Sequence, residues 1–243
     1  MTQFVYFYVQ APDNGRELQI SITSVQKNFS GDAKITVIGE KPHWYTGHHI
    51  PMTQFRGIHD AHARMPFRDT QHKIMAAASH PEIDEEFVWI MDDCFMMKPT
   101  TIEEIMIPRF DPWYRINMKS VWHQLIRMTF IALQRNGKTN MQYSTHLPHA
   151  FEKSKLNEMF GIYDFPKQLL LFENLYGNHY NNPDKSLPYG ANWNGVQHVQ
   201  FLTRLLRPAT RSQLDQIDCH FLNYQSKCWN ASMRLWLENR FMQ

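Results

Sequence analysis

The sequence has little cysteine and contains no long apolar run. Its three cysteines, Cys94, Cys219 and Cys228, lack Cys-x-x-Cys spacing, which indicates free thiols in a reducing compartment rather than a disulfide framework. No apolar stretch approaches the roughly 20 residues that cross a membrane. The N-terminus lacks the basic segment and the small-residue cleavage site of a signal peptide. These absences predict a soluble, cytoplasmic protein.

The sequence also lacks a strong charge of either sign. The formal net charge is +2 and the pI is near 8.4, with the basic residues scattered along the chain. No basic run resembles a nucleic-acid-binding tail, although the balance is compatible with an anionic ligand or with nucleic acid. The 13 histidines include no His-x-His or His-Glu-x-x-His spacing, which argues against those zinc sites.

The first 40 residues alternate between strand-like and helix-like patterns. Residues 4–9 (FVYFYV) are aromatic and β-branched, whereas residues 16–29 place apolar side chains on one helical face. Residues 33–39 predict a second strand, closed by a glycine. This order is typical of a parallel βαβ unit. At 243 residues, 43% of them hydrophobic, the chain is long enough to bury a sizeable core.

The alternation continues with a helix over residues 68–80 and a strand over residues 85–91. The sequence therefore predicts an α/β protein with a central, mostly parallel sheet and a helix-rich C-terminal half. Residues 41–57 have the composition of a loop, and residues 100–104 that of a helix capping box. The later patterns predict helices over 119–137, 151–163 and 166–180, a polar loop over 181–195, a strand over 196–202 and a final helix capped by Asn230.

Two adjacent acids, Asp92 and Asp93, stand where the predicted third strand ends (FVWIMDDCFMMKP). The carboxyl ends of parallel strands are where open α/β sheets bind ligands. Carboxylate oxygens suit Mg²⁺ or Mn²⁺, and a few protein ligands suffice when substrate phosphates complete the shell. The pair is thus a candidate site for a divalent ion and a nucleotide diphosphate. The alternative is that Asp92 caps the following turn while Asp93 is solvated.

The segment FVWIMDDCFMMKP resembles the acidic-motif strand of metal-dependent glycosyltransferases with the GT-A fold. RELQISITSVQKNF with KITVIGEKP resembles their opening βαβ unit, and FRDTQHKIMAAASHPEIDEEF resembles the helix before the acidic strand in a subgroup of bacteriophage and capsule-type sugar transferases. The resemblance implies a GT-A-like Rossmann-type sandwich. Residues 1–115 would form the nucleotide-sugar-binding half, and residues 116–243 an acceptor-binding, helix-rich half of the same domain. The sequence departs from the motif at Met91, where the first acid often stands.

The same resemblance implies which residues contact the donor. The end of the first strand and the start of the next helix should border the nucleotide, and the helix before the acidic strand should contact its base, sugar or phosphate. For the basic members of that helix, an exposed ion pair is the alternative. The expected donor-binding residues are Gln10, Ala11, Arg16, Glu17, Arg68, Asp69 and Lys73.

Further candidates lie in the second half. The resemblance implies a histidine–proline element near the active site, which matches His146 and His149 in YSTHLPHAF, although exposed loop histidines would look alike. It also implies a late metal-binding histidine, for which His220 is the candidate and a buried, hydrogen-bonded histidine the alternative. An inverting reaction needs a base, and Glu152, Asp164 and Glu173 are candidates. The full catalytic prediction is Asp92, Asp93, His146, His149 and Glu152.

The predicted activity is sugar transfer from a nucleotide sugar, most simply a UDP-sugar, to an acceptor hydroxyl, with Mn²⁺ or Mg²⁺. The favoured acceptor is a hydroxymethylated pyrimidine in phage DNA, in the host cytoplasm, and the alternative is a capsule or lipopolysaccharide glycan. Trp193, in the polar loop, is a candidate to stack on a sugar or base. Two other functions fit the paired acids: a non-catalytic nucleotide- or nucleic-acid-binding module, and a nucleotidyltransferase.

Overall fold

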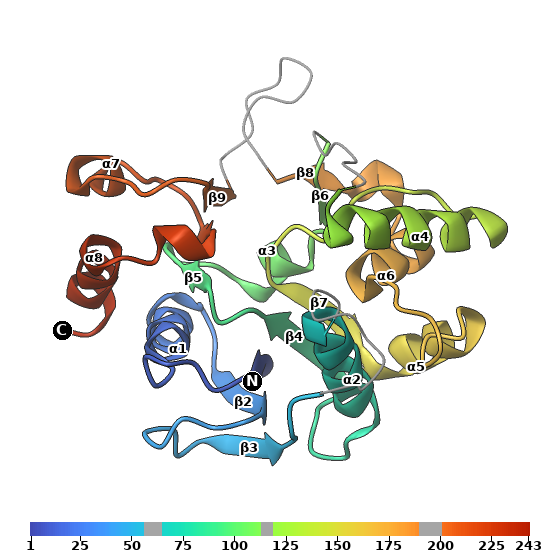
Figure 1. The fold of residues 1–243 in the computed structure, drawn as a ribbon, viewed down its shortest axis with the longest axis horizontal. Helices are drawn as coiled ribbons and strands as arrows, with labels where there is room; N and C mark the ends of the chain where they lie inside the picture. Colours follow the sequence, from blue (N-terminus) through green and yellow to red (C-terminus); the bar gives the residue numbers. More distant parts are fainter. Residues whose placement is uncertain (56–64, 113–118, 190–200) are drawn as a thin grey trace.

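A five-stranded sheet forms the centre of the protein (Figure 1). The computed structural model describes residues 1–55, 65–112, 119–189 and 201–243. The strand order is β3–β2–β1–β4–β7, in which the first four strands are parallel and β7 is antiparallel to β4. This architecture confirms the predicted fold class. The strands are β1 (Thr2–Tyr8), β2 (Ala33–Gly39), β3 (His48–Pro51), β4 (Glu86–Ile90) and β7 (His149–Glu152).

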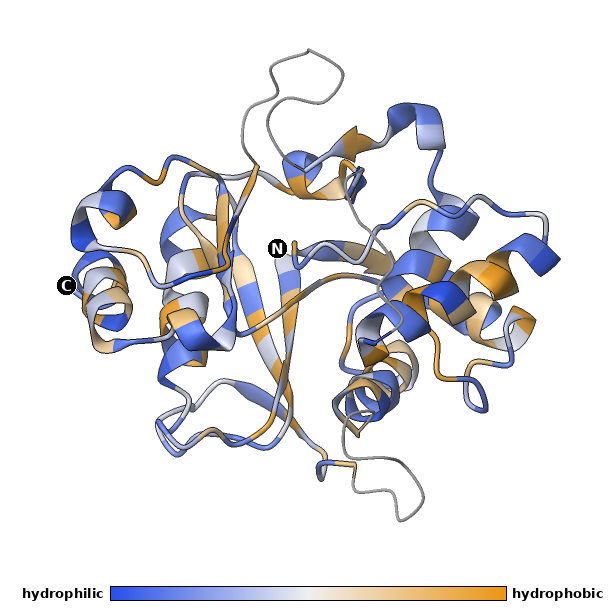
Figure 2. Ribbon diagram, turned by 45° about the horizontal axis from the view of Figure 1, so that its top comes forward, coloured by the Kyte–Doolittle hydropathy of each residue, from blue (hydrophilic) through white to orange (hydrophobic). Residues whose placement is uncertain are grey.

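Helices cover both faces of this sheet, because alternate side chains of each strand point to opposite sides. On one face Phe4 and Tyr6 of β1 pack with Leu18 of α1 (Arg16–Asn28). On the other, Val5 packs in a cluster that includes residues of α2 (Met65–Ser79). Figure 2 shows the resulting apolar stretches along the central strands. The second cluster also contains residues of α4 (Val121–Arg135), α5 (Lys153–Ile162) and α6 (Phe172–Tyr180).

The C-terminal part of the chain returns to pack against the N-terminal part. A three-stranded sheet joins β5 (Cys94–Met96), β10 (Phe221–Tyr224) and β9 (Leu202–Leu205), with β10 in the middle. The last helix, α8 (Ala231–Phe241), contacts α1. Residues that directly follow β4 therefore lie beside residues more than 100 positions later. The remaining elements are α3 (Ile102–Met106), β6 (Arg109–Phe110), β8 (Leu187–Pro188), α7 (Arg211–Asp215) and two short 3-10 helices, η2 (Pro183–Lys185) and η3 (Ser226–Cys228).

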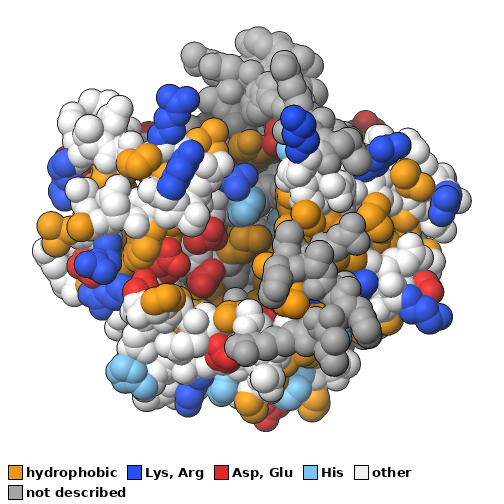
Figure 3. All heavy atoms as spheres, viewed as in Figure 1, with side chains coloured by type: hydrophobic (Ala, Val, Ile, Leu, Met, Phe, Trp, Pro, Cys, Tyr) orange, Lys and Arg blue, Asp and Glu red, His pale blue; other side chains and the backbone are white. Residues whose placement is uncertain are grey.

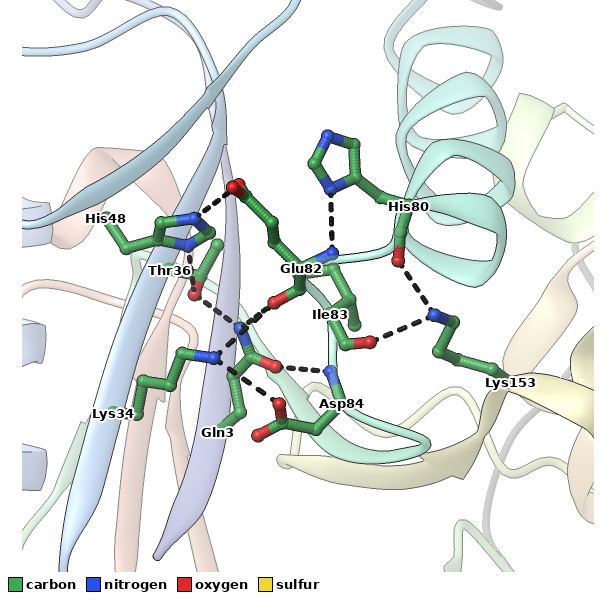
Figure 4. Close-up of polar contacts among 9 residues, drawn as sticks. All are labelled: Gln3, Lys34, Thr36, His48, His80, Glu82, Ile83, Asp84 and Lys153. Carbon is green, nitrogen blue, oxygen red and sulfur yellow. Dashed lines mark hydrogen bonds and ion pairs between the residues drawn. The ribbon is translucent and has the colours of Figure 1, made fainter.

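A polar network holds the amino-terminal edge of the sheet together (Figure 4). The buried Gln3 side chain donates from Nε2 to Thr36 Oγ1 at 2.7 Å and accepts from the backbone N–H of Asp84 at 2.6 Å. Thr36 in turn contacts His48 Nδ1 at 3.0 Å, and His48 Nε2 contacts Glu82 at 2.8 Å. The network ties the turn before β4 to β1, β2 and β3, and so fixes the register of the strand that ends at the two aspartates.

Several local predictions are confirmed. The capping box forms at Thr101 and Glu104, and Asn230 caps α8 by accepting from the backbone N–H of Met233. Residues 41–57, predicted as a loop, contain the edge strand β3. The helix predicted over 166–180 begins only at Phe172, since Pro166 and the residues after it form a turn. No described helix has the length and apolar character needed to span a bilayer. Trp193 lies outside the described residues.

Candidate functional site

Asp92 and Asp93 occupy the tight turn between β4 and β5, at the carboxyl end of the parallel sheet. The turn is closed by the backbone N–H of Cys94, which donates to the carbonyl of Met91 at 3.2 Å. Because β4 and β5 belong to different sheets, both carboxylates lie at the junction between these sheets. Both side chains are only partly exposed. The predicted position at the rim of the sheet is therefore confirmed by the fold.

The two carboxyls are held in an environment that disfavours their ionised forms. Burial and the neighbouring charge of Asp93 raise the pKa of Asp92 to about 7. Burial, together with the charge of Glu17, raises the pKa of Asp93 to about 6 against the lowering effect of Asn223 and Arg204. Carboxyls with raised pKa values are typical of functional sites, and a nearby positive charge stabilises their ionised forms. Within the protein, Lys73 has this effect on Asp92 and Arg204 has it on Asp93, but the pKa values of both carboxyls stay raised.

Glu17, near the start of α1, adds a third acid to this group. Burial raises its pKa to about 7, and its carboxylate accepts a hydrogen bond from the hydroxyl of Tyr224 on β10. The ring of Tyr224 packs nearly parallel to the rings of Phe95 and Trp229, at centroid distances of 5.9 and 5.5 Å. Glu17, predicted to border the nucleotide, thus belongs to the same electrostatic group as the two aspartates.

Asn223 of β10 completes the group, and the sequence patterns did not single it out. Its Nδ2 donates to the backbone carbonyl of Asp93 at 3.1 Å. Its Oδ1 and Asp93 Oδ1 are both buried, and neither has a hydrogen-bond partner. Buried oxygens without partners are costly and rare in native proteins. The position of these two oxygens beside clustered carboxylates makes this turn a candidate cation site.

These oxygens fit a hard divalent ion. Mg²⁺ and Mn²⁺ prefer carboxylate and amide oxygens, and Mg²⁺ is commonly held by one or two carboxylates with substrate phosphates. Asp93 and Asn223 offer the unpartnered atoms, and Asp92 offers a second carboxylate. Within the described ranges, no group of three or more histidine, cysteine or acidic residues has the arrangement of a complete metal site.

A pocket of about 530 Å³ opens next to the acidic group. It includes Met91, which precedes Asp92, as well as Arg204 of β9 and Gln225, which follows β10. In the space-filling view, acidic side chains gather beside a central hollow whose wall carries a histidine and basic side chains (Figure 3). Arg204 lines the pocket, and its positive charge lowers the pKa values of both Asp93 and His146.

The loop after β1 contains Gln10 and Ala11 and lies at the same end of the sheet. The backbone N–H of Gln10 donates to Glu40 at 2.6 Å, and that of Ala11 donates to the hydroxyl of Tyr8 at 3.1 Å. Both residues therefore lie at the carboxyl end of β1, the end of the sheet at which the two aspartates stand. Arg16 pairs instead with Glu238 of α8 at 2.7 Å, and so fastens α8 to α1.

Asp69 and Lys73 of α2 form a buried ion pair at 2.5 Å. Lys73 Nζ also donates to the carbonyl of Tyr8 at 3.0 Å, and Asp69 accepts from the backbone N–H of Phe55 at 2.8 Å. The alternative of an exposed ion pair is wrong for Lys73, which is buried. The charged groups of Asp69 and Lys73 are already bonded within the protein, and the charge of Lys73 reaches the site only through its field, which lowers the pKa of Asp92. Arg68 Nη1 donates to Gln71 at 2.8 Å.

His146, His149 and Glu152 lie at three different places in the structure. His146 has a left-handed backbone (φ 59°), lines the 530 Å³ pocket, and has a pKa lowered to about 3 by burial and by the charge of Arg204. His149 pairs with Trp89 across β4 and β7 and is stacked on its ring. Glu152 pairs with Glu86 at the amino end of β4, six residues before Asp92, and bonds Lys155 at 2.5 Å.

His220 lies away from the acidic pair. In the ladder between β10 and β5, Asn223 is opposite Cys94, whereas the carbonyl of His220 accepts from the backbone N–H of Met97. The imidazole is 3.3 Å from Thr100 Oγ1 and stacked on Phe201. The structure therefore does not bring His220 to Asp92 and Asp93. Among β10 side chains, it brings Asn223 there instead.

Comparisons with known proteins agree on the fold. Neither a protein-family profile nor a curated protein sequence matches the chain. An active-site variant of LgtC is similar over 100% of this chain and 97% of its own, at a TM-score of 0.51 and 9% identity. A structure of galactosyltransferase LgtC with donor and acceptor sugar analogues gives a TM-score of 0.49 at 9% identity, over 100% and 97% of the two chains. The bifunctional glycosyltransferase WbbM, of which this chain covers 52%, gives 0.52 at 8% identity over 100% of this chain.

Identities this low show a shared fold and nothing more. The chain has the α/β architecture of GT-A-type glycosyltransferases, with a central, mostly parallel sheet and the acidic group at its carboxyl edge. This is the fold that the sequence resemblance implied.

Proposed function

We propose that the protein is a glycosyltransferase that takes its sugar from a nucleotide-sugar donor, with a divalent ion at Asp92, Asp93 and Asn223. The observation that carries the proposal is the pair of buried, unpartnered oxygens on Asp93 and Asn223, next to carboxyls with raised pKa values. A bound divalent ion neutralises a diphosphate and stabilises it as a leaving group. The GT-A-type fold of the chain supports the same conclusion.

In this proposal the residues of the site divide the work. Asp92 and Asp93 hold the ion, and the amide oxygen of Asn223 supplies a third oxygen ligand. Arg204 places a positive charge on the pocket side of the acids, where it would reduce the charge of the departing diphosphate. The hydroxyl of Tyr224 keeps Glu17 in place. UDP-sugars remain the first donors to test.

The charge of the pocket lining bears on whether the acceptor is a glycan or DNA. A glycan acceptor is compatible with the GT-A-type fold of the chain. A DNA acceptor needs cations to contact successive phosphates, and Arg204 is the sole lysine or arginine among the described residues that line the pocket. The distribution of charge therefore favours a sugar over a DNA acceptor.

The test is donor turnover by the purified protein. Incubation with UDP-, GDP- and ADP-sugars plus Mn²⁺ should release a nucleoside diphosphate, slowly by hydrolysis and faster with an acceptor. Asp93→Asn should abolish the Mn²⁺-dependent release. Asp218→Asn is the matched control, because Asp218 is exposed and pairs only with Lys98 at the surface. Release of pyrophosphate from nucleoside triphosphates would instead identify a nucleotidyltransferase. Failure to bind or turn over any donor would refute the proposal.

A further inference from the structure

The 530 Å³ pocket beside the acidic group has a lining that the proposed function does not yet use. Aromatic rings form much of its wall, including Phe67 and Trp122, which stack on each other at 6.0 Å. Trp89 is 2% exposed, and its Nε1 is buried with no hydrogen-bond partner. An indole N–H can only donate, so a ligand oxygen in the pocket would satisfy it. The lining therefore combines flat apolar faces with a free donor.

Glu173 is the carboxyl of this pocket. It stands in the first turn of α6, is 5% exposed, and lines both the large pocket and a second, small cavity of about 50 Å³. The hydroxyl of Ser144 donates to Glu173 Oε1 at 2.8 Å. Burial raises the pKa of Glu173 to about 7. Keeping an acid buried with so little support costs stability, and sites with a function are where proteins accept such a cost.

The small cavity that Glu173 also lines contains polar groups. Arg109 Nε, Thr145 Oγ1 and His149 Nε2 are buried there without hydrogen-bond partners. One ordered water needs about 10–15 Å³ of such space and two to four polar partners, so the cavity has room for a few waters. Because Glu173 lines both cavities, its carboxyl can be hydrated from the small cavity while it accepts hydrogen bonds from a ligand in the large pocket.

We propose that this pocket binds the acceptor as an uncharged sugar ring, with Trp122 against its apolar face and Glu173 accepting hydrogen bonds from its hydroxyls. The proposal rests on the proposed function and adds to it an acceptor class and an acceptor-anchoring residue. A pyranose has one apolar face for an aromatic ring and a rim of hydroxyl donors for a carboxylate. A polyanionic acceptor would be repelled by the carboxylate of Glu173, and Arg204 is the one lysine or arginine among the described lining residues that could offset this repulsion.

The experiment measures acceptor kinetics with a set of methyl hexopyranosides at saturating donor and Mn²⁺. A hydrogen bond to a charged group is worth about 1.5–3 kcal/mol, so Glu173→Ala should raise the acceptor KM about 10- to 150-fold. Donor KM and the slow hydrolysis of the donor should not change. Glu173→Gln keeps a partner for Ser144 and should lie between the wild type and Glu173→Ala. Trp122→Ala should also raise acceptor KM alone.

Glu158→Gln is the matched control, because Glu158 is exposed on α5 and bonds only Tyr180. Saturation-transfer NMR of the methyl hexopyranosides, with donor product and Mn²⁺ present, gives a direct binding readout for each variant. Absence of any signal from the wild type would overturn the inference, as would transfer to a hydroxymethylcytosine oligonucleotide and to no sugar. Unchanged acceptor KM in folded Glu173→Ala would overturn it while the proposed function stands. If the wild type does not hydrolyse any nucleotide-sugar donor, that result would instead count against the proposed function.

Discussion

Without metal, the acidic group should destabilise the protein, and Asp93→Asn should relieve part of this cost. The pKa of Asp93 rises from 3.8 to about 6 in the folded protein. One pKa unit corresponds to about 1.4 kcal/mol, so keeping this carboxyl ionised costs about 3 kcal/mol. Partial exposure reduces the figure to about 2 kcal/mol. For a chain of this length, 2 kcal/mol corresponds to a Tm change of roughly 4–8 °C.

The direction of the pH dependence follows from the raised pKa. Folding takes up a proton on Asp93 at pH values between its unfolded pKa and its folded pKa of about 6. The stability associated with the neutral carboxyl is therefore lost as the pH rises through about 6. The metal-free wild type should melt at a lower temperature at pH 8 than at pH 5.5, and Asp218→Asn, which keeps Asp93, should show the same change. Asp93→Asn should show a smaller difference and melt higher than the wild type at pH 8.

Mn²⁺ should reverse this order. A ligand present at 100 times its Kd stabilises the folded state by about 2.7 kcal/mol, and Asn in place of Asp93 removes one of the charges that bind the ion. The assay is differential scanning fluorimetry of three proteins, the wild type, Asp93→Asn and Asp218→Asn, with and without Mn²⁺. The reasoning is refuted if Asp93→Asn is less stable than the wild type at pH 8 without metal, or if Mn²⁺ raises both Tm values equally.

Two further predictions concern stability outside the site. Lys73→Met should lower the free energy of unfolding by about 3–5 kcal/mol, measured with urea, because it leaves Asp69 buried without its charged partner; weakened donor binding at unchanged stability would instead support a direct contact with the donor. Glu82→Gln should reduce the loss of stability in acid, because the hydrogen bond from His48 lowers the pKa of Glu82 and the stability it gives disappears as the pH falls through that pKa. An acid-unfolding curve that matches the wild type would contradict this role.

The sequence predicts elements whose causes are local. The strand at 33–39 and the cap at Asn230 lie where expected, because β-branched runs and capping side chains act within a few residues. β5 and β10 are only three and four residues long and pair across more than 100 positions. A strand this short carries no periodicity of its own, so sequence patterns could not identify either one.

The candidate site divides in the same way. Asp92 and Asp93 were found because they are adjacent and end a strand. Asn223 and Arg204 were missed, since each reaches Asp93 only through the pairing of β10 with β5 and β9. Lys73 was placed on the correct helix, but the pattern does not say that its amine turns inward to Asp69 and the carbonyl of Tyr8.

Charge at the site has a consequence for the order of binding under the proposed function. Glu17, Asp92 and Asp93 are all acids whose pKa values are raised by burial. The negative charge of Asp92 also raises the pKa of Glu17, that of Asp93 raises the pKa of Asp92, and that of Glu17 raises the pKa of Asp93. A diphosphate adds further negative charge, and the cation nearest to the acids among the described pocket residues is Arg204. One guanidinium cannot offset both sets of charges, because each like-charge approach in a partly buried site costs more than in water. The divalent ion must therefore be bound first or arrive with the donor, and donor affinity is set by the ion that Asp93 and Asn223 retain.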